Sequence, residues 1–244
     1  MSYLKVIIEG EAPRGPLPGL IYQEALEAGR WLLIFEGKDP LRALKALSAE
    51  IVEAEETEGA LLRTPSGLEF SPFGEPSARK IVLSVEGAFG SGLHPTTRLC
   101  LELLDGLTPE EGPALDLGCG TGILALLLAR KGWPRVVALD VSPEAIKVLA
   151  KNIAQNRLKG RIFPVLGGLS ALKGPFSLVA ANLYLRLLIP EAQIIKGLLA
   201  PGGRLVLSGF LEESLPAVKR AYEGLVLEEE RTLQGWAALK FLTP

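Results

Sequence analysis

The sequence predicts an α/β protein with a doubly wound, mostly parallel seven-stranded sheet and a small N-terminal α+β domain. From residue 114 onwards, short apolar runs alternate with helical patterns, which favours parallel strands covered by helices. A glycine-rich turn follows the first of these runs, and open parallel sheets bind their ligands at the carboxyl ends of the strands. With 244 residues, the chain is long enough for one large and one small domain.

Residues 1–58 are expected to form the small domain. Their apolar runs and helical patterns are too short for a parallel sheet, and the Pro- and Gly-rich stretch 13–19 interrupts them. The predicted strands are 3–8, 31–35 and 51–54, and the predicted helices are 20–28 and 41–47.

Residues 59–79 lose this periodicity and are expected to form a linker. Within it, the segment 63–69 is expected to be the tip of a hairpin, because proline and glycine mark turns there. The turn residues of the linker include Pro65, Gly67, Pro72, Gly74 and Pro76.

Residues 80–244 carry the regular alternation and are expected to form the large, Rossmann-like domain. The last of its helices should end at the segment 201–203, Pro-Gly-Gly, which starts a new strand. The tail 224–242 reads as two strands joined at Gln234-Gly235. The other predicted strands are 81–85, 114–117, 135–140, 161–166, 176–181 and 203–208, and the helices include 98–104, 123–130, 143–156 and 184–199.

Composition places the chain among ordinary globular proteins, with 48% hydrophobic and 22% charged residues. There is no apolar run of about eighteen residues and no basic-then-apolar amino terminus, so we expect neither a membrane span nor a signal peptide. Cys100 and Cys119 have no metal-binding spacing, and His94 is the one histidine. We therefore predict no metal site, reduced thiols and a cytoplasmic location.

Charge is distributed unevenly along the chain, although the net charge of −2 gives no strong nucleic-acid footprint. Residues 1–75 hold 7 Lys and Arg against 13 Asp and Glu, a net of −6, whereas the rest hold 19 against 15, a net of +4. The acidic stretch 50–58 is either a solvated face or a docking surface for a basic partner. The low content of Asn, Gln, Cys and Met is a thermophile tendency.

Residues 116–122, Asp-Leu-Gly-Cys-Gly-Thr-Gly, predict a nucleotide-binding turn between a strand and a helix. Glycine adopts positive φ and lets the backbone approach a ligand closely, and the free N–H groups at the start of the helix suit a carboxylate or a phosphate. A dinucleotide fingerprint would need glycine at position 123, where this chain has Ile123. Asp140 ends the next apolar run, 22 residues after Gly118, near the spacing at which a carboxylate reaches ribose hydroxyls.

Two further motifs narrow the class of protein to which the chain is similar. Residues 87–97 read Gly-Ala-Phe-Gly-Ser-Gly-Leu-His-Pro-Thr-Thr, and residues 181–184 read Ala-Asn-Leu-Tyr at the end of the fourth core strand. With the Asp-x-Gly-x-Gly-x-Gly turn between them, they resemble the class I S-adenosylmethionine-dependent lysine methyltransferases of a ribosomal stalk-base protein, the eleventh protein of the large subunit. The resemblance covers residues 80–240. It implies a methyl donor as cofactor and a small N-terminal domain that recognises the substrate.

The resemblance also implies roles for single residues. Asp140 would take the ribose hydroxyls, and Gly118 would give close backbone approach to the donor. Thr97 would meet the amino-acid end of the donor. Asn182 would be the catalytic residue, lying beside the methyl group with its side-chain oxygen accepting from an incoming amine. The full set of implied cofactor-binding residues is Phe89, Thr97, Asp116, Gly118, Gly120, Gly122, Asp140, Leu169 and Asn182.

Simpler interpretations stay open for several residues of these motifs. Thr97 could be no more than a helix cap, Asn182 could be no more than the end of a strand, and Tyr184 could be a packing residue. His94 could be a general base at pH 7, but ordering of the loop is favoured because a proline follows it in a turn.

We predict N-methylation of amino groups of a basic protein, lysine side chains or the amino terminus, with a ribosomal protein as the first candidate. A nucleic-acid amine methyltransferase would usually show Asn/Asp-Pro-Pro-aromatic, whereas residues 182–185 read Asn-Leu-Tyr-Leu. A small-molecule methyltransferase, with the N-terminal domain as a lid, is the main alternative. A module that binds the methyl donor without catalysing transfer is the third alternative.

Overall fold

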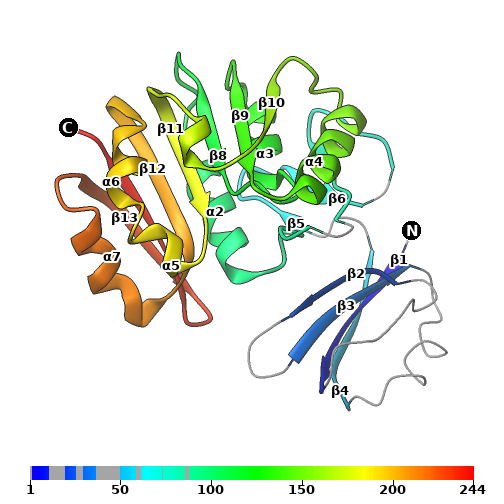
Figure 1. The fold of residues 1–244 in the computed structure, drawn as a ribbon. Helices are drawn as coiled ribbons and strands as arrows, with labels where there is room; N and C mark the ends of the chain where they lie inside the picture. The colour runs from blue at the N-terminus through cyan, green and yellow to red at the C-terminus, as the bar shows by residue number, and fades with distance from the viewer. Residues whose placement is uncertain are drawn as a thin grey trace.

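The main body of the protein is a seven-stranded, mostly parallel sheet (Figure 1). The computed structural model describes residues 2–10, 20–25, 30–36, 50–58, 62–72, 74–85 and 88–244. The strands of the main sheet are β8 (Ala114–Leu117), β9 (Val136–Asp140), β10 (Ile162–Leu166), β11 (Phe176–Asn182), β12 (Leu199–Leu211), β13 (Val226–Leu233) and β14 (Trp236–Leu242).

The strand order β10-β9-β8-β11-β12-β14-β13 is that of a doubly wound sheet. The first five strands are parallel, β14 is antiparallel to β12, and β13 is antiparallel to β14. The tail therefore forms the predicted pair of strands, with the turn at Gln234-Gly235. The predicted fold class is confirmed.

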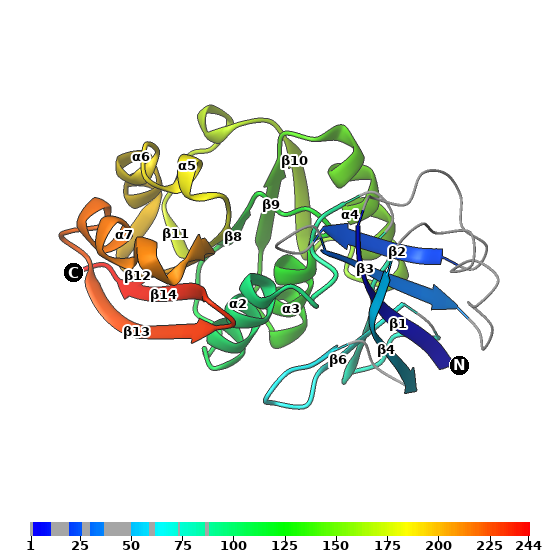
Figure 2. The same ribbon diagram turned by 90° about the horizontal axis from the view of Figure 1, so that it is seen from below.

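Helices cover both faces of this sheet (Figures 1 and 2). Because side chains alternate along a strand, Ala114 packs with the helices of one face and Leu115 with those of the other. On the first face lie α2 (Pro95–Asp105), α3 (Ile123–Lys131) and α4 (Pro143–Gln155); on the second lie α5 (Leu185–Leu188), α6 (Ala192–Gly197) and α7 (Leu215–Ala221). Two 3-10 turns, η2 (Leu169–Ala171) and η3 (Glu212–Ser214), complete the connections.

Local sequence sets where α4 begins and which face it buries. The hydroxyl of Ser142 accepts a hydrogen bond from the N–H of Ala145 at 3.2 Å, and proline occupies the first helical position. Ala145, Leu149 and Ile153 follow at intervals of four and are buried, and the last two belong to the core on this face of the sheet. This places the start of α4 directly after the end of β9, at the edge of the sheet where the predicted turn lies.

The predicted single helix over 184–199 is wrong. The segment forms two short helices, α5 and α6, and its last residue already belongs to β12. Pro190 lies between the two helices, where it lacks an N–H and disfavours helical geometry in the residue before it.

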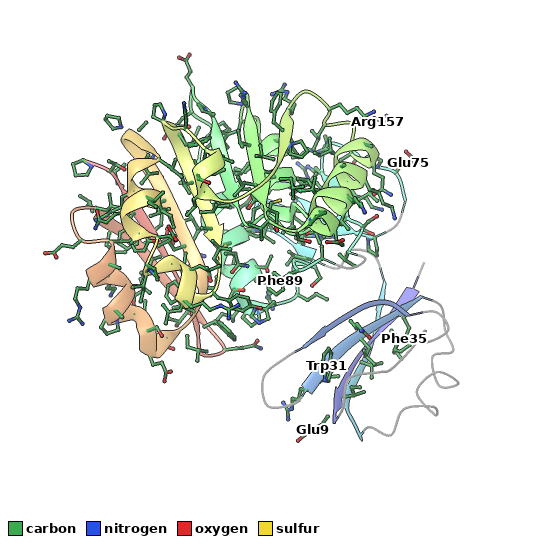
Figure 3. The ribbon with its side chains drawn as sticks, in the orientation of Figure 1. Glu9, Trp31, Phe35, Glu75, Phe89 and Arg157 are labelled. Carbon is green, nitrogen blue, oxygen red and sulfur yellow. The ribbon has the colours of Figure 1, made fainter. Side chains whose placement is uncertain are left out.

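The N-terminal part forms a separate four-stranded antiparallel sheet in the order β2-β3-β1-β4. Its strands are β1 (Ser2–Glu9), β2 (Leu20–Ala25), β3 (Arg30–Glu36) and β4 (Glu50–Glu58). Val6, Ile8, Leu33 and Phe35 form its buried cluster, and Figure 3 labels Trp31 and Phe35 on β3.

One predicted helix of this part, 20–28, is wrong, because residues 20–25 pair with β3 as a strand. Pairing with a neighbouring strand outweighs a weak helical pattern, and Ile21 and Tyr22 are residue types that favour strands. The other predicted helix, 41–47, lies outside the described residues.

A small three-stranded sheet precedes the large domain, formed by β5 (Leu62–Arg63), β6 (Glu69–Ser71) and β7 (Lys80–Val82). The predicted hairpin at 63–69 is confirmed by the antiparallel pairing of β5 and β6. Leu68 and Phe70 are buried in the core formed by α2, α3 and α4. The side chain of Asp105, at the end of α2, accepts hydrogen bonds from the N–H and the hydroxyl of Ser66, both at 2.7 Å.

These contacts tie residues 62–71 to the large domain. The division of the chain into a domain over 1–58, a linker over 59–79 and a domain over 80–244 stays a prediction.

Just after the end of α4, Arg157 pairs with Glu75 at 3.4 Å (Figure 3). Among the described residues, no helix is both long and apolar enough to cross a membrane.

Candidate functional site

A cavity of about 880 Å³ lies at the carboxyl ends of β8, β9 and β11, where the fold predicts a ligand. Six of the nine predicted cofactor-binding residues line it: Phe89, Gly118, Gly120, Asp140, Leu169 and Asn182. The other three, Thr97, Asp116 and Gly122, do not line the cavity and lie behind it, in α2, in β8 and at the start of α3.

Positive φ favours glycine throughout the turn, and at Gly120 a close backbone contact requires it. Gly118 and Gly120 have φ of +73° and +52°, conformations that side chains rarely adopt. A Cβ on Gly120 would lie 2.2 Å from the carbonyl oxygen of Phe89, and one on Gly118 would lie 2.3 Å from Leu183 Cδ2. A Cβ on Gly122, which caps α3, would lie 2.2 Å from Leu149 Cδ1. The turn is therefore pressed against the loop that carries Phe89.

Asp140 joins the turn to the start of α4 while facing the cavity. Its Oδ2 accepts from the N–H of Gly120 and its Oδ1 from the N–H of Ser142, both at 2.9 Å. Each carboxylate oxygen keeps a further lone pair for a hydroxyl group in the cavity. The carboxylate thus shapes the turn and keeps acceptor capacity toward the cavity; its binding to a ribose stays a prediction.

Asp116 is buried behind the glycine turn, where it bonds the start of α3. It is 1% exposed, and its Oδ2 accepts from the N–H of Ala125 in the first turn of α3 at 2.9 Å. Its Oδ1 is buried without a hydrogen-bond partner among the described residues. Burial raises the pKa of Asp116 from 3.8 to about 7, with a smaller contribution from the negative charge of Asp140, while the Ala125 N–H opposes the shift.

Asn182 ends β11 and lines the cavity. Its Nδ2 donates to the hydroxyl oxygen of Thr97 at 3.2 Å. Thr97 is buried in the first turn of α2, so its hydroxyl fixes the orientation of the amide. Within the described part of the chain, Asn182 Oδ1 has no hydrogen-bond donor, which leaves it available to an amine in the cavity.

His94 orders the loop before α2. Its Nδ1 accepts from the N–H of Thr96 at 3.3 Å and lies 2.8 Å from the Thr96 hydroxyl, so it caps the helix. Its ring meets those of Phe89 and Trp236 edge-on, at centroid distances of 5.6 and 4.8 Å. Burial lowers the pKa of His94 below its ordinary 6.5, which favours the neutral ring. These contacts support the predicted ordering role.

Several residues at the site were missed by the sequence analysis. Trp236 lines the cavity from the start of β14, and Gly209 lines it from β12. A Cβ on Gly209 would lie 2.2 Å from the carbonyl oxygen of Leu183, so glycine is required there. The available signals were the hairpin turn that ends just before Trp236 and an isolated glycine inside a strand, which often marks a close approach.

Large apolar side chains surround the mouth of the cavity. Phe89 is 46% exposed, Tyr184 is 65% exposed, and Val141 and Leu187 are also exposed. The guanidinium of Arg186 lies 5.3 Å from the centroid of the Tyr184 ring. Exposed apolar groups gathered around a cavity mark a surface for a ligand or a partner.

In the described ranges, no three His, Cys, Asp or Glu side chains are grouped to hold a metal ion.

Known proteins share both the sequence pattern and the fold. The family described as ribosomal protein L11 methyltransferase (PrmA) matches residues 72–243. Ribosomal protein L11 methyltransferases of Geobacter sp. (strain M21) and Azotobacter vinelandii are 38% and 39% identical, over 64% and 68% of this chain. These matches cover 53% and 57% of those relatives, so the chain aligns with little more than half of their length.

Two solved structures show the same fold. Ribosomal protein L11 methylase of Lactobacillus delbrueckii subsp. bulgaricus has a TM-score of 0.56 and 24% identity, covering 60% of this chain and 77% of that one. A methyltransferase from Pyrococcus furiosus has a TM-score of 0.52 and 20% identity, covering 66% of this chain and 88% of that one.

The sheet order and the glycine turn at its carboxyl edge define a Rossmann-like, class I methyltransferase fold. Within that class, the chain belongs to the ribosomal protein L11 methyltransferase (PrmA) family. Membership confirms S-adenosylmethionine as the cofactor, and the site fits it. Asp140 presents a carboxylate to the cavity, the turn presents backbone groups, and Phe89 and Leu169 supply apolar walls, a set of groups that suits a nucleoside with an amino-acid tail.

Proposed function

We propose that the protein transfers methyl groups from S-adenosylmethionine to amino groups of a protein, lysine side chains or the amino terminus, with ribosomal protein L11 as the first candidate. One observation carries the proposal. The amide of Asn182, oriented by Thr97, ends the strand beside the glycine turn and lines the cavity, and its oxygen has no hydrogen-bond donor among the described residues. The names of the relatives support the choice of substrate.

The cofactor supplies a methyl group on a sulfonium, which is already an activated leaving group. The chain's own task is to hold a neutral amine in line with that methyl group, an effect of orientation. A free lysine amine has a pKa of about 10.4, and desolvation in an apolar cavity favours its neutral form. Asn182 Oδ1 then accepts a hydrogen bond from the amine N–H and aims the lone pair. His94 lines the cavity with its Nδ1 engaged as a helix cap, and an amine that is already neutral needs no catalytic base, so none is assigned.

The partner is proposed to be basic. Residues 1–75 carry a net charge of −6, and exposed charges of one sign speed association with a partner of the opposite sign. We further propose that the protein works in the cytoplasm with reduced thiols. Its low Asn, Gln, Cys and Met content supports a thermophilic origin.

The test is a competition between substrate classes. The protein is incubated with labelled S-adenosylmethionine and either ribosomal protein L11, a ribosomal RNA fragment or a metabolite extract. Label in L11 alone is the expected result. Label in a metabolite and none in protein would replace the proposal by a small-molecule methyltransferase.

A further inference from the structure

We propose that Asn152, on α4, is a positioning residue that holds the loop carrying Phe89 against the cofactor turn. The inference rests on the proposed donor site. Asn152 lies outside the cavity lining and is completely buried. Its role is therefore to set the shape of the cavity without contact to its contents.

The side-chain amide of Asn152 bonds two segments that are far apart in sequence. Its Oδ1 accepts from the N–H of Ser84 at 2.7 Å, and its Nδ2 donates to the carbonyl oxygens of Ser84 and Thr121, both at 2.9 Å. Ser84 leads into the loop of Phe89, and Thr121 belongs to the cofactor turn. One amide thus satisfies three backbone groups and fixes the entry to the loop relative to the turn.

Thr121 carries the connection from Asn152 to the wall of the cavity. Its N–H donates to the carbonyl oxygen of Phe89 at 2.9 Å, and its hydroxyl donates to that of Gly90 at 2.6 Å. The contact is tight, because a Cβ on Gly90 would lie 2.9 Å from Thr121 Oγ1. Phe89 and Gly120, on the two sides of this contact, both line the cavity. A shift of Thr121 would therefore move both.

Asn156 provides a matched control one turn further along. It is 2% exposed, and its Oδ1 accepts from the N–H of Val82 at 2.8 Å. Its Nδ2 donates to the carbonyl oxygens of Val82 and Asn152, at 2.6 and 2.8 Å. The two asparagines match in burial and in number of hydrogen bonds, but only Asn152 bonds the cofactor turn. Their comparison separates positioning of the site from plain stabilisation.

The experiment compares full-length Asn152→Ala and Asn156→Ala by calorimetric titration with S-adenosylhomocysteine and by thermal unfolding. Each substitution leaves buried backbone groups without their hydrogen-bond partner, so both variants should unfold at lower temperature. Asn152→Ala should weaken binding by about tenfold or more, and Asn156→Ala by less than about threefold. Equal weakening in both variants, or none in either, would overturn the proposal.

Hydrogen exchange at the Thr121 amide supplies a readout that needs neither ligand nor methyl acceptor. That N–H is bonded to Phe89, so its exchange should speed up in Asn152→Ala and not in Asn156→Ala. Equal exchange at Thr121 in both variants would overturn the positioning role even if the donor binds. If wild-type protein fails to bind S-adenosylhomocysteine, the donor assignment fails, and this exchange still decides the role of Asn152.

Should Asn152→Ala not fold, Thr121→Val breaks the same connection at its other end. The substitution replaces the hydroxyl that donates to the Gly90 carbonyl oxygen by a methyl group and leaves α4 untouched. It should weaken S-adenosylhomocysteine binding more than Asn156→Ala does. Binding as tight as in wild type would contradict the inference.

Discussion

The side chains of Thr97 and Asn182 meet beside the cavity, where Asn182 Nδ2 donates to Thr97 Oγ1 at 3.2 Å. The first residue belongs to the start of α2 and the second to the end of β11, so the bond crosses from helix to sheet. One of the two Nδ2 hydrogens goes to Thr97, and this bond fixes which side of the amide carries Oδ1, the acceptor atom for a substrate amine. Thr97 was predicted to contact the donor; here it orients the residue predicted to act on the acceptor.

We expect Thr97→Val to lower the turnover number about fivefold to tenfold while donor affinity changes by less than about threefold, since it removes one side-chain hydrogen bond. Asn182→Ala should reduce turnover further with similarly small effect on donor affinity. Single-turnover kinetics and calorimetry measure the two quantities. Thr97→Ser, which keeps the hydroxyl, is the control. If Thr97→Val still slowed turnover in an Asn182→Ala background by the same factor, the two residues would not act as a pair.

Asp140→Asn should weaken donor binding by about ten- to a hundredfold, the equivalent of roughly 1.5–3 kcal/mol for a hydrogen bond to a charged group. An asparagine offers one acceptor atom where Gly120 and Ser142 present two N–H groups. The matched control is Glu144→Gln, which alters a nearby carboxylate that does not line the cavity. Calorimetric titration should find the control unchanged. Donor affinity retained in folded Asp140→Asn would remove the ribose assignment.

His94→Asn should keep turnover within about tenfold of wild type, because asparagine also caps helices. His94→Ala should lose about 1 kcal/mol of stability through the missing cap, beyond the loss of the ring contacts with Phe89 and Trp236. Turnover and thermal unfolding of both variants check this. A loss of a hundredfold or more in His94→Asn would instead assign a general base to this histidine.

Asp116 should make stability depend on pH. Its pKa of about 7 in the folded protein exceeds the ordinary 3.8, so the folded state holds a proton that the unfolded chain releases. The stabilisation from this group is full below about pH 4 and is lost as pH rises through about 7. Asp116→Asn has no charge to bury, so its melting temperature relative to wild type should rise between pH 5 and pH 8. A difference that stays constant over this range would contradict the shifted pKa.

The sequence was sufficient for the sheet and the turn because each depends on local signals. Alternating apolar runs predicted the parallel strands, and the glycine spacing predicted a ligand turn that is not a dinucleotide fingerprint. The methyl donor itself was implied by the resemblance of the three motifs. Pairing of 20–25 with β3 could not be predicted in this way, since it depends on a neighbouring strand. The break between α5 and α6 did have a local signal, the proline at position 190. The prediction of one helix over 184–199 gave more weight to the helical pattern on both sides of Pro190.

Hydrogen bonds between distant segments explain why parts of the site were missed. Asn152 reaches Ser84 across 68 positions of the chain, and no spacing in the sequence indicates that pairing. Asp116 and Gly122 belong to the cofactor motif, yet they support the turn from behind. A motif identifies residues that build a site, whereas contact with the ligand depends on which way the folded backbone faces.

The most direct test of the account is tandem mass spectrometry of ribosomal protein L11 after incubation with this protein and S-adenosylmethionine, with Asn182→Ala as control. The account predicts added methyl groups on lysine side-chain amines or the amino-terminal amine, and far slower addition with the variant. Unmodified L11, or methyl groups on oxygen or sulfur atoms, would contradict it.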